Sequence, residues 1–239
     1  MRWLLFLLCL SVATPVWAGA SRSFDGTDDY IDMGNVLDVT TNDVSQCIWI
    51  KVTPDDANFD EIIGRRGGGG TSAGYRLRQR NTDDFPASQA MDGVDTANAA
   101  GTTDLDLSWF FVCGTWNQTT NDSIVYVNAI SEGTINNSAV DSLTNAVNFQ
   151  IGTNSDGTND LKGLAAYGHN YLSKVLSVVE VTELMWNPGS ITDSLSGFWP
   201  LWGASTEQDL SGNGRTGTVT GATTSTDGPP VMIGGYLPV

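Results

Sequence analysis

Residues 109–116, Trp-Phe-Phe-Val-Cys-Gly-Thr-Trp, and residues 123–130, Ser-Ile-Val-Tyr-Val-Asn-Ala-Ile, decide the fold class of this chain. Each run is short, apolar and rich in β-branched and aromatic residues, which is typical of a β-strand. The segment between them, residues 117–122, consists of Asn, Gln, Thr and Asp, which favour turns. Two short strands separated by a turn are therefore expected, as an all-β sandwich requires.

The same alternation of strand-like runs and turn clusters continues outward along the chain. Further candidate strands are residues 29–33, 45–53, 61–66, 74–80, 147–152 and 161–171. Clusters such as Gly-Gly-Gly-Gly at 67–70 separate them. One helix is predicted, because Ser177 and Glu180 have the spacing of a capping box and Pro188 ends the periodic stretch. Its β-branched valines leave another strand as the alternative.

The composition excludes several classes of protein. Asp, Gly, Asn, Ser and Thr, which favour turns and strand edges, supply 112 of the 239 residues, against only 5 Glu and 3 Lys. A helical bundle and a doubly wound α/β fold are therefore excluded. The chain is 40% hydrophobic and contains 8 Trp, which is too apolar for a disordered protein. Its net charge of −16 repels phosphate, so no nucleic-acid partner is expected.

Residues 1–20 are expected to be a signal peptide. Arg2 supplies the positive end, residues 3–12 form a short apolar run, and Ala18 and Ala20 are equally good cleavage points. The run is too short to span a bilayer, and no later segment approaches about eighteen apolar residues, so no membrane insertion is expected. We therefore expect an extracellular protein, secreted or attached to a cell surface or particle, with residues 21–239 as a single domain.

Export would place Cys47 and Cys113 in an oxidising compartment. Each cysteine lies within a candidate strand. A disulfide between them would be worth about 4 kcal/mol on the chain-entropy model. Two unrelated buried thiols are the alternative.

Several motifs, in order along the chain, resemble the laminin-G-like domains of the concanavalin A-like lectin/glucanase superfamily. They are residues 23–34 (SFDGTDDYIDMG), 47–51, 109–128, 149–152, 161–163 and the predicted helix. The resemblance implies a jelly-roll β-sandwich of two antiparallel sheets with one short helix. The positions of Cys47 and Cys113 resemble those of the single pentraxin disulfide, which implies that they are bonded. Residues 198–201 and 209–214 resemble a unit that usually precedes the first strand of the family, but here they follow the helix.

No catalytic site is expected. Glycosidases of this fold use two carboxylates, commonly spaced Glu-x-Asp-x-x-Glu on one strand, and none of the 5 glutamates fits that pattern. The single histidine, His169, lies in a candidate core strand and is predicted to be packed rather than catalytic. No Cys/His cluster offers a zinc site.

Calcium is the one cofactor that the sequence suggests. The loop 154–160, Asn-Ser-Asp-Gly-Thr-Asn-Asp, concentrates the carboxylate and amide oxygens that calcium prefers, and Asn154, Asp156 and Asp160 are the candidate ligands. By its position the loop resembles the pentraxin calcium loop, although the second ligand segment has no clear counterpart near residues 71–72. An ordinary Asx-rich turn is the alternative.

A ligand site is predicted around the main concentration of positive charge. It comprises five arginines, Arg65, Arg66, Arg76, Arg78 and Arg80. In an extended strand, Arg76, Arg78 and Arg80 form an exposed row on the face opposite Tyr75. Tyr75 and Trp116 lie at or near strand ends and could supply aromatic surfaces for sugar rings. We predict that the strand 75–80, with Tyr75 and the arginine row, and the loops at Trp116 and 154–160 bind an anionic glycan. A solvated sheet face is the alternative for the arginine row.

Two classes of function remain. The first is a secreted, non-catalytic module that binds a glycan or a surface glycoprotein. The second is a structural or assembly subunit of a surface layer, filament or particle, which would use the sandwich as a scaffold and form homo-oligomers. The fold alone does not choose between them, because function depends on sites placed on a fold.

Overall fold

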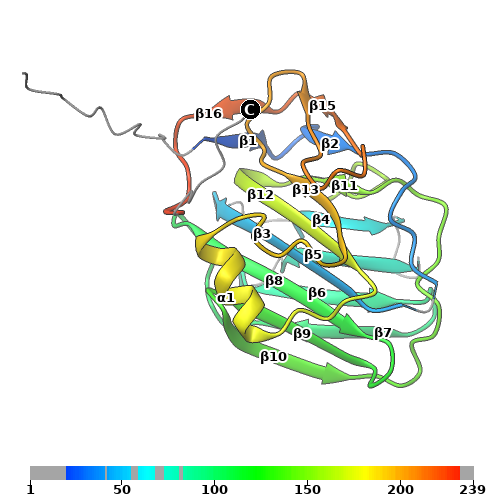
Figure 1. The fold of residues 1–239 in the computed structure, drawn as a ribbon. Helices are drawn as coiled ribbons and strands as arrows, with labels where there is room; N and C mark the ends of the chain where they lie inside the picture. Colours follow the sequence, from blue (N-terminus) through cyan, green and yellow to red (C-terminus); the bar gives the residue numbers. More distant parts are fainter. Residues whose placement is uncertain (1–19, 41, 55–58, 68–72, 81–82, 232–239) are drawn as a thin grey trace, which may run out of the picture.

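The computed structural model describes residues 20–40, 42–54, 59–67, 73–80 and 83–231. These residues form two eight-stranded sheets, whose paired strands are antiparallel, and one short helix (Figure 1). The predicted all-β jelly-roll sandwich is therefore confirmed. The expected signal peptide lies outside the described residues except for Ala20.

The two sheets take their strands from distant parts of the chain. Sheet A contains, in spatial order, β10 (Ile130–Asn136), β9 (Asp122–Val127), β8 (Phe110–Asn117), β3 (Val44–Val52), β12 (Lys162–Leu172), β1 (Ser21–Asp25) and β16 (Thr223–Ser225), and β13 (Leu195–Trp199) also pairs with β12. Sheet B contains β14 (Thr206–Glu207), β15 (Gly217–Thr220), β2 (Tyr30–Asp32), β11 (Gln150–Ile151), β4 (Glu61–Arg66), β5 (Gly74–Gln79), β6 (Pro86–Met91) and β7 (Thr96–Ala100).

The main core lies between the sheets, because alternate residues of each strand point inward. Sheet A contributes Ile48, Ile50, Val112 and Val125, and sheet B contributes Ile31, Ile63, Leu77 and Ile151. Burying a side chain of this size contributes about 1.5–3 kcal/mol. The inward residues thus hold the two sheets together and leave their neighbours to form the two outer faces.

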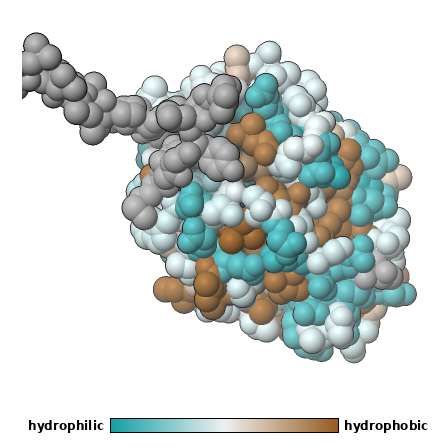
Figure 2. Space-filling model, viewed as in Figure 1, coloured by the Kyte–Doolittle hydropathy of each residue, from teal (hydrophilic) through white to brown (hydrophobic). Residues whose placement is uncertain are grey.

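A helix covers part of the outer face of sheet A. Helix α1 (Val178–Trp186) begins with the predicted capping box, in which the Ser177 side chain accepts a hydrogen bond from the Glu180 backbone and Glu180 accepts one from the Ser177 backbone. Its buried face joins a second apolar cluster with Trp49 and Phe111. In Figure 1, α1 lies in front of sheet A, and Figure 2 shows hydrophobic and hydrophilic residues interspersed on this side. The helix was predicted correctly.

The disulfide lies in this second cluster. Cys47 of β3 and Cys113 of β8 are directly opposite in the strand register, and the two sulfur atoms are bonded at 2.08 Å. Both cysteines are fully buried beside Trp49 and Phe111. The predicted disulfide is confirmed.

The segment after the helix completes both sheets. It adds β14 and β15 to sheet B, and β13 and β16 to sheet A. Arg22 of β1 forms a buried ion pair with Glu207 of β14, which ties the first strand to the last part of the described chain. No helix in the described ranges combines the length and the apolarity that a membrane span needs.

Candidate functional site

The outer face of sheet B is polar. A register row crosses it through Thr218, Asp32, Gln150, Gly64, Arg76, Gln89 and Asn98, each paired with the next on the neighbouring strand. The chain neighbours Ile31, Ile63 and Leu77 point into the core, so the row points away from it. Successive side chains of each strand point to opposite faces, so this face carries side chains that can form hydrogen bonds.

Three arginines gather on this face with one glutamate, and we call Glu61, Arg66, Arg76 and Arg78 the arginine cluster. Arg76 Nη1 lies 2.5 Å from Glu61 Oε2, and Arg76 Nε donates to Gln89 Oε1 at 2.7 Å. Gln89 continues the network to the next strand by donating to Asn98 Oδ1 at 2.9 Å. These bonds fix the Arg76 guanidinium.

Glycine is required beside this guanidinium. A Cβ atom at Gly64 would lie 2.6 Å from Cβ of Arg76 and 2.7 Å from the carbonyl oxygen of Tyr75. Strands β4 and β5 therefore approach closely at this point, and Arg76 occupies the space above Gly64.

The cluster contains more positive than negative charge. Burial and the neighbouring Arg76 lower the pKa of Arg78 to about 10, and the positive charges of Arg66 and Arg80 act in the same direction against the opposing effect of Glu61. Burial and Arg76 also lower the pKa of Arg66, against the opposing effects of Glu61 and Asp156. An anion near these guanidinium groups would offset both the desolvation and the repulsion between like charges.

Several buried polar atoms of this face lack a hydrogen-bond partner among the described residues. They are Glu61 Oε1, Gln150 Oε1 and Arg78 Nε, on side chains that are 1%, 8% and 9% exposed. Arg78 also stacks on Phe59, with Cζ 4.2 Å from the ring centroid. Because buried polar atoms are almost always hydrogen-bonded, these acceptors and this donor suit a polar ligand.

Two of the predicted site residues are not on this surface. Tyr75 is 2% exposed and its hydroxyl donates to the Leu37 carbonyl at 2.7 Å, whereas Trp116 is 1% exposed and its Nε1 donates to Gln118 Oε1 at 3.1 Å. Both rings belong to the core between the sheets. The expectation that they form an aromatic ligand surface was wrong, because both side chains alternate to the inner face of their strands.

The predicted arginine row is also more buried than expected. Arg76 and Arg78 do point to the face opposite Tyr75 and Leu77, but they are only 5% and 9% exposed. Arg80 follows the end of β5, is partly exposed and pairs with Asp83 at 2.9 Å. The row is not an exposed stripe, because the neighbouring residues of β4 and β6 enclose its first two members.

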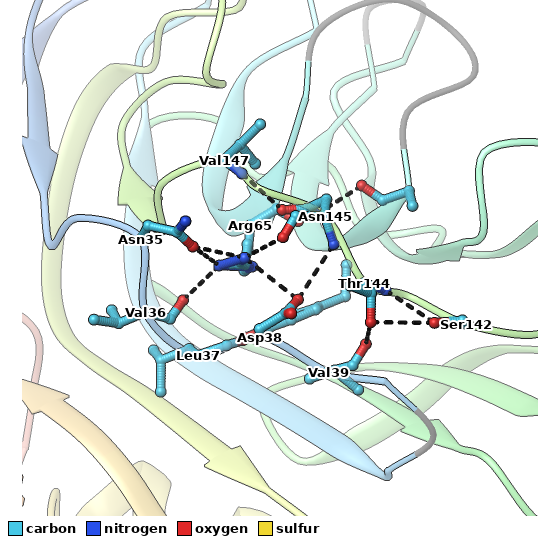
Figure 3. Close-up of polar contacts among 12 residues, drawn as sticks. Asn35, Val36, Leu37, Asp38, Val39, Arg65, Ser142, Thr144, Asn145 and Val147 are labelled. Atoms are coloured by element: carbon cyan, nitrogen blue, oxygen red, sulfur yellow. Dashed lines mark hydrogen bonds and ion pairs between the residues drawn. The ribbon is translucent and has the colours of Figure 1, made fainter.

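Arg65 has a structural role and faces away from Arg66. Its Nη1 donates to the Val36 carbonyl at 2.9 Å, its Nη2 donates to the Asn145 carbonyl at 2.5 Å, and it pairs with Asp38 at 3.3 Å (Figure 3). Asn145 in turn donates to the backbone carbonyls of Arg65 and Ala73. Arg65 therefore joins two loops at one end of the sandwich.

The proposed calcium loop is closed by its own hydrogen bonds. Asn154 Oδ1 accepts from the backbone N–H groups of Asp156 at 3.3 Å and Thr158 at 3.1 Å, and Asp160 Oδ1 accepts from the Thr153 hydroxyl at 2.5 Å. This is the pattern of an Asx turn. The amide oxygen of Asn154 is thus already used, which weakens its fit as a calcium ligand.

Carboxylates come closest together elsewhere in the described part of the chain. The two groups of three with oxygen atoms within 4.8 Å of one another are Asp25, Asp28, Asp29 and Asp84, Asp104, Asp106. Burial raises the pKa of Asp160, and the negative charges of Asp28 and Asp25 raise it further, so the loop ends near the first group. Calcium binding at Asn154, Asp156 and Asp160 stays a prediction.

His169 is packed in the interior. Its ring stacks on Phe198 with centroids 4.4 Å apart, and its Nε2 accepts a hydrogen bond from the Gly189 backbone at 3.1 Å. Burial lowers the pKa of His169 to about 3, so the imidazole is neutral at physiological pH. The arrangement is that of a structural histidine.

The structure is thus a jelly-roll sandwich with one sheet face partly covered by a helix and the other face polar. The chain belongs to the concanavalin A-like lectin/glucanases superfamily, since the laminin-G-type family model matches residues 25–168, more than half of the sequence. The resemblance noted in the sequence is therefore confirmed. Among curated proteins, none matches this chain.

Solved structures share the fold at low sequence identity. A Bacteroides ovatus protein assigned to carbohydrate binding is 19% identical with a TM-score of 0.70, and the match covers 90% of this chain and 62% of that one. A heptameric SAP-like pentraxin from Limulus polyphemus is 16% identical with a TM-score of 0.53, covering 70% and 82%. The CBM40 module of a Ruminococcus gnavus sialidase is 12% identical with a TM-score of 0.52, covering 70% and 98%. The chain thus spans less than two thirds of the Bacteroides protein.

Proposed function

We propose that this chain is an extracellular, non-catalytic carbohydrate-binding module that binds an anionic glycan on the outer face of sheet B. The observation that carries the proposal is the arginine cluster, in which three buried guanidinium groups lie near Glu61, with Asp156 also acting on Arg66. Arginine binds carboxylate and sulfate groups through paired N–H donors. Arg78 is the residue expected to contact the anion, because no ion pair joins it to a carboxylate in the described ranges.

Neighbouring polar atoms would recognise the rest of the sugar. The unpartnered oxygen atoms of Glu61 and Gln150 are acceptors for sugar hydroxyl groups. The similarity to a Bacteroides protein assigned to carbohydrate binding and to a sialidase CBM40 module supports this class of ligand. The Cys47–Cys113 disulfide supports an extracellular location, where such bonds persist.

A glycan array tests this proposal. The exported protein is applied to neutral, sialylated, uronate-containing and sulfated glycans, with calcium and with a chelator. We expect binding to acidic glycans that weakens as salt is added, because salt screens the attraction between the anionic glycan and the arginine cluster. Binding confined to neutral glycans, or no binding at all, would exclude the arginine cluster as an anionic-glycan site. Glycan binding that a chelator weakens would support calcium at Asn154, Asp156 and Asp160. A melting temperature that stays the same when calcium is added would argue against calcium at these residues.

An assembly subunit is the second candidate function. Its support is the exposed side of α1, where Val178, Val179 and Trp186 are 51%, 73% and 41% exposed. The related Limulus pentraxin is heptameric. Light scattering over a range of protein concentrations distinguishes the two functions, since an assembly subunit should self-associate without a glycan.

A further inference from the structure

A pocket of about 260 Å³ lies on the C-terminal part of the sandwich, in the segment that follows β13. Its lining includes Pro200, Trp202, Thr206, Glu207, Gln208 and Leu210. None of these residues belongs to the arginine cluster. The pocket therefore offers a binding surface that is independent of the proposed anionic-glycan site.

The framework of the pocket is held by a fully satisfied ion pair. All five N–H donors of Arg22 have acceptors: Glu207 takes two, and the carbonyl groups of Gly203, Ala204 and Ala222 take the others. Glu207 also accepts from the Gly203 backbone at 3.0 Å. The charge of Glu207 is thus neutralised, and no other charged side chain is among the lining residues given by the structure.

An aromatic ring is held in position at this pocket. Trp202 is 40% exposed and packs edge-on against the buried Tyr167, with ring centroids 5.6 Å apart and an interplanar angle of 88°. The Tyr167 backbone donates to the Pro200 carbonyl at 3.1 Å. Leu201, which lies between Pro200 and Trp202 in the chain, has a left-handed backbone (φ 66°) and is fully buried. Leu201 anchors the loop in the core, and the next side chain, Trp202, is displayed at the pocket.

The surroundings of this ring are polar and uncharged. Thr206 and Gln208 are exposed and offer a hydroxyl and an amide, while Leu210 adds an apolar edge that is 52% exposed. A neutral sugar needs this combination, because its ring carries an apolar face and its hydroxyl groups need both donors and acceptors. A free anion finds no unpaired cation here, since Arg22 is saturated.

We propose that this pocket is a second glycan-binding site that takes one neutral hexopyranose unit, stacked on Trp202 and hydrogen-bonded by Gln208 and Thr206. Its size suits a single sugar unit rather than a long oligosaccharide, because 260 Å³ is below the usual range of drug-sized ligand sites. The module would then hold a charged unit on sheet B and a neutral unit at the C-terminal segment.

The test uses neutral hexaoses of glucose, mannose and galactose, each built of hexopyranose units, titrated calorimetrically into the exported protein. We expect at least one to bind, and Trp202→Ala to weaken that binding about tenfold or more. Trp202→Phe should retain part of the affinity. Trp186→Ala is the matched control, because Trp186 is 41% exposed but lies on α1.

Further arms separate this site from the arginine cluster. Binding of the neutral hexaose should persist in high salt and in the Arg78→Gln variant. Gln208→Ala should weaken this binding without changing the unfolding of the chain by urea. A parent protein that binds a neutral hexaose but no acidic glycan would contradict the proposed function and leave this inference intact. The inference is overturned if none of the hexaoses binds, or if Trp202→Ala binds them as tightly as the parent.

Discussion

The outer faces of the two sheets differ, although both follow the same alternation of residues. On sheet A, the outward residues Trp49 and Phe111 and the Cys47–Cys113 disulfide form an apolar cluster with α1. On sheet B, the outward residues include Arg78, which no ion pair joins to a carboxylate in the described ranges, so an apolar element that covered it would leave its charge unpaired. The apolar face therefore stabilises the fold, and the polar face is the one on which we propose the ligand site.

The largest effect should come from the covered face. Replacing both Cys47 and Cys113 with Ala should lower the free energy of unfolding by about 4 kcal/mol, because the unfolded chain loses its cross-link. Urea denaturation of the double variant beside the parent measures the change. An unchanged unfolding free energy would show that the disulfide does not stabilise sheet A.

A smaller effect on the same side depends on pH. The unfolded chain protonates His169 near its ordinary pKa of 6.5, but burial lowers the folded pKa to about 3. The contribution of neutral His169 to the free energy of unfolding is therefore fully present above pH 6.5 and is lost as the pH falls toward 3. The loss is about 2 kcal/mol at pH 5 relative to pH 8. His169→Gln should remove this part of the pH dependence in urea titrations. A variant with the parent's full pH dependence would mean that other groups cause it.

The smallest effect on stability is expected on the polar face. Arg78→Gln should change the free energy of unfolding by less than about 1 kcal/mol, because the lost stacking on Phe59 is offset by relief of repulsion from Arg76 and of desolvation. Thermal and urea unfolding measure this change. A loss comparable to that of the disulfide variant would make Arg78 a structural residue and remove the contrast between the faces.

The sequence predicted the fold well, because the fold depends on local patterns. Short alternating runs with turn clusters indicated the sandwich, and Ser177 with Glu180 indicated the start of α1. The face on which Arg76 lies also followed from the two-residue period of a strand.

The sequence predicted the site only in part, because its members meet through strand pairing. Glu61, Gln89 and Gln150 come from three strands other than β5, and no local signal brings them beside Arg76. The burial of Trp116 was missed because its position near a strand end suggested exposure, whereas its side chain points into the core between the sheets. The Trp202 pocket depends on a contact with Tyr167 of β12, which also requires the folded chain.

The central claim is that the polar face of sheet B binds an anionic glycan through Arg78. The most direct measurement is the affinity of the parent, Arg78→Gln and Lys51→Gln for the best acidic glycan from the array, at low and high salt. Lys51 is the matched control, because it is a partly exposed cation on sheet A paired with Asp227. The account predicts that Arg78→Gln weakens binding about tenfold or more and reduces its salt dependence, while Lys51→Gln binds as the parent does. Equal affinity of the parent and Arg78→Gln would contradict it.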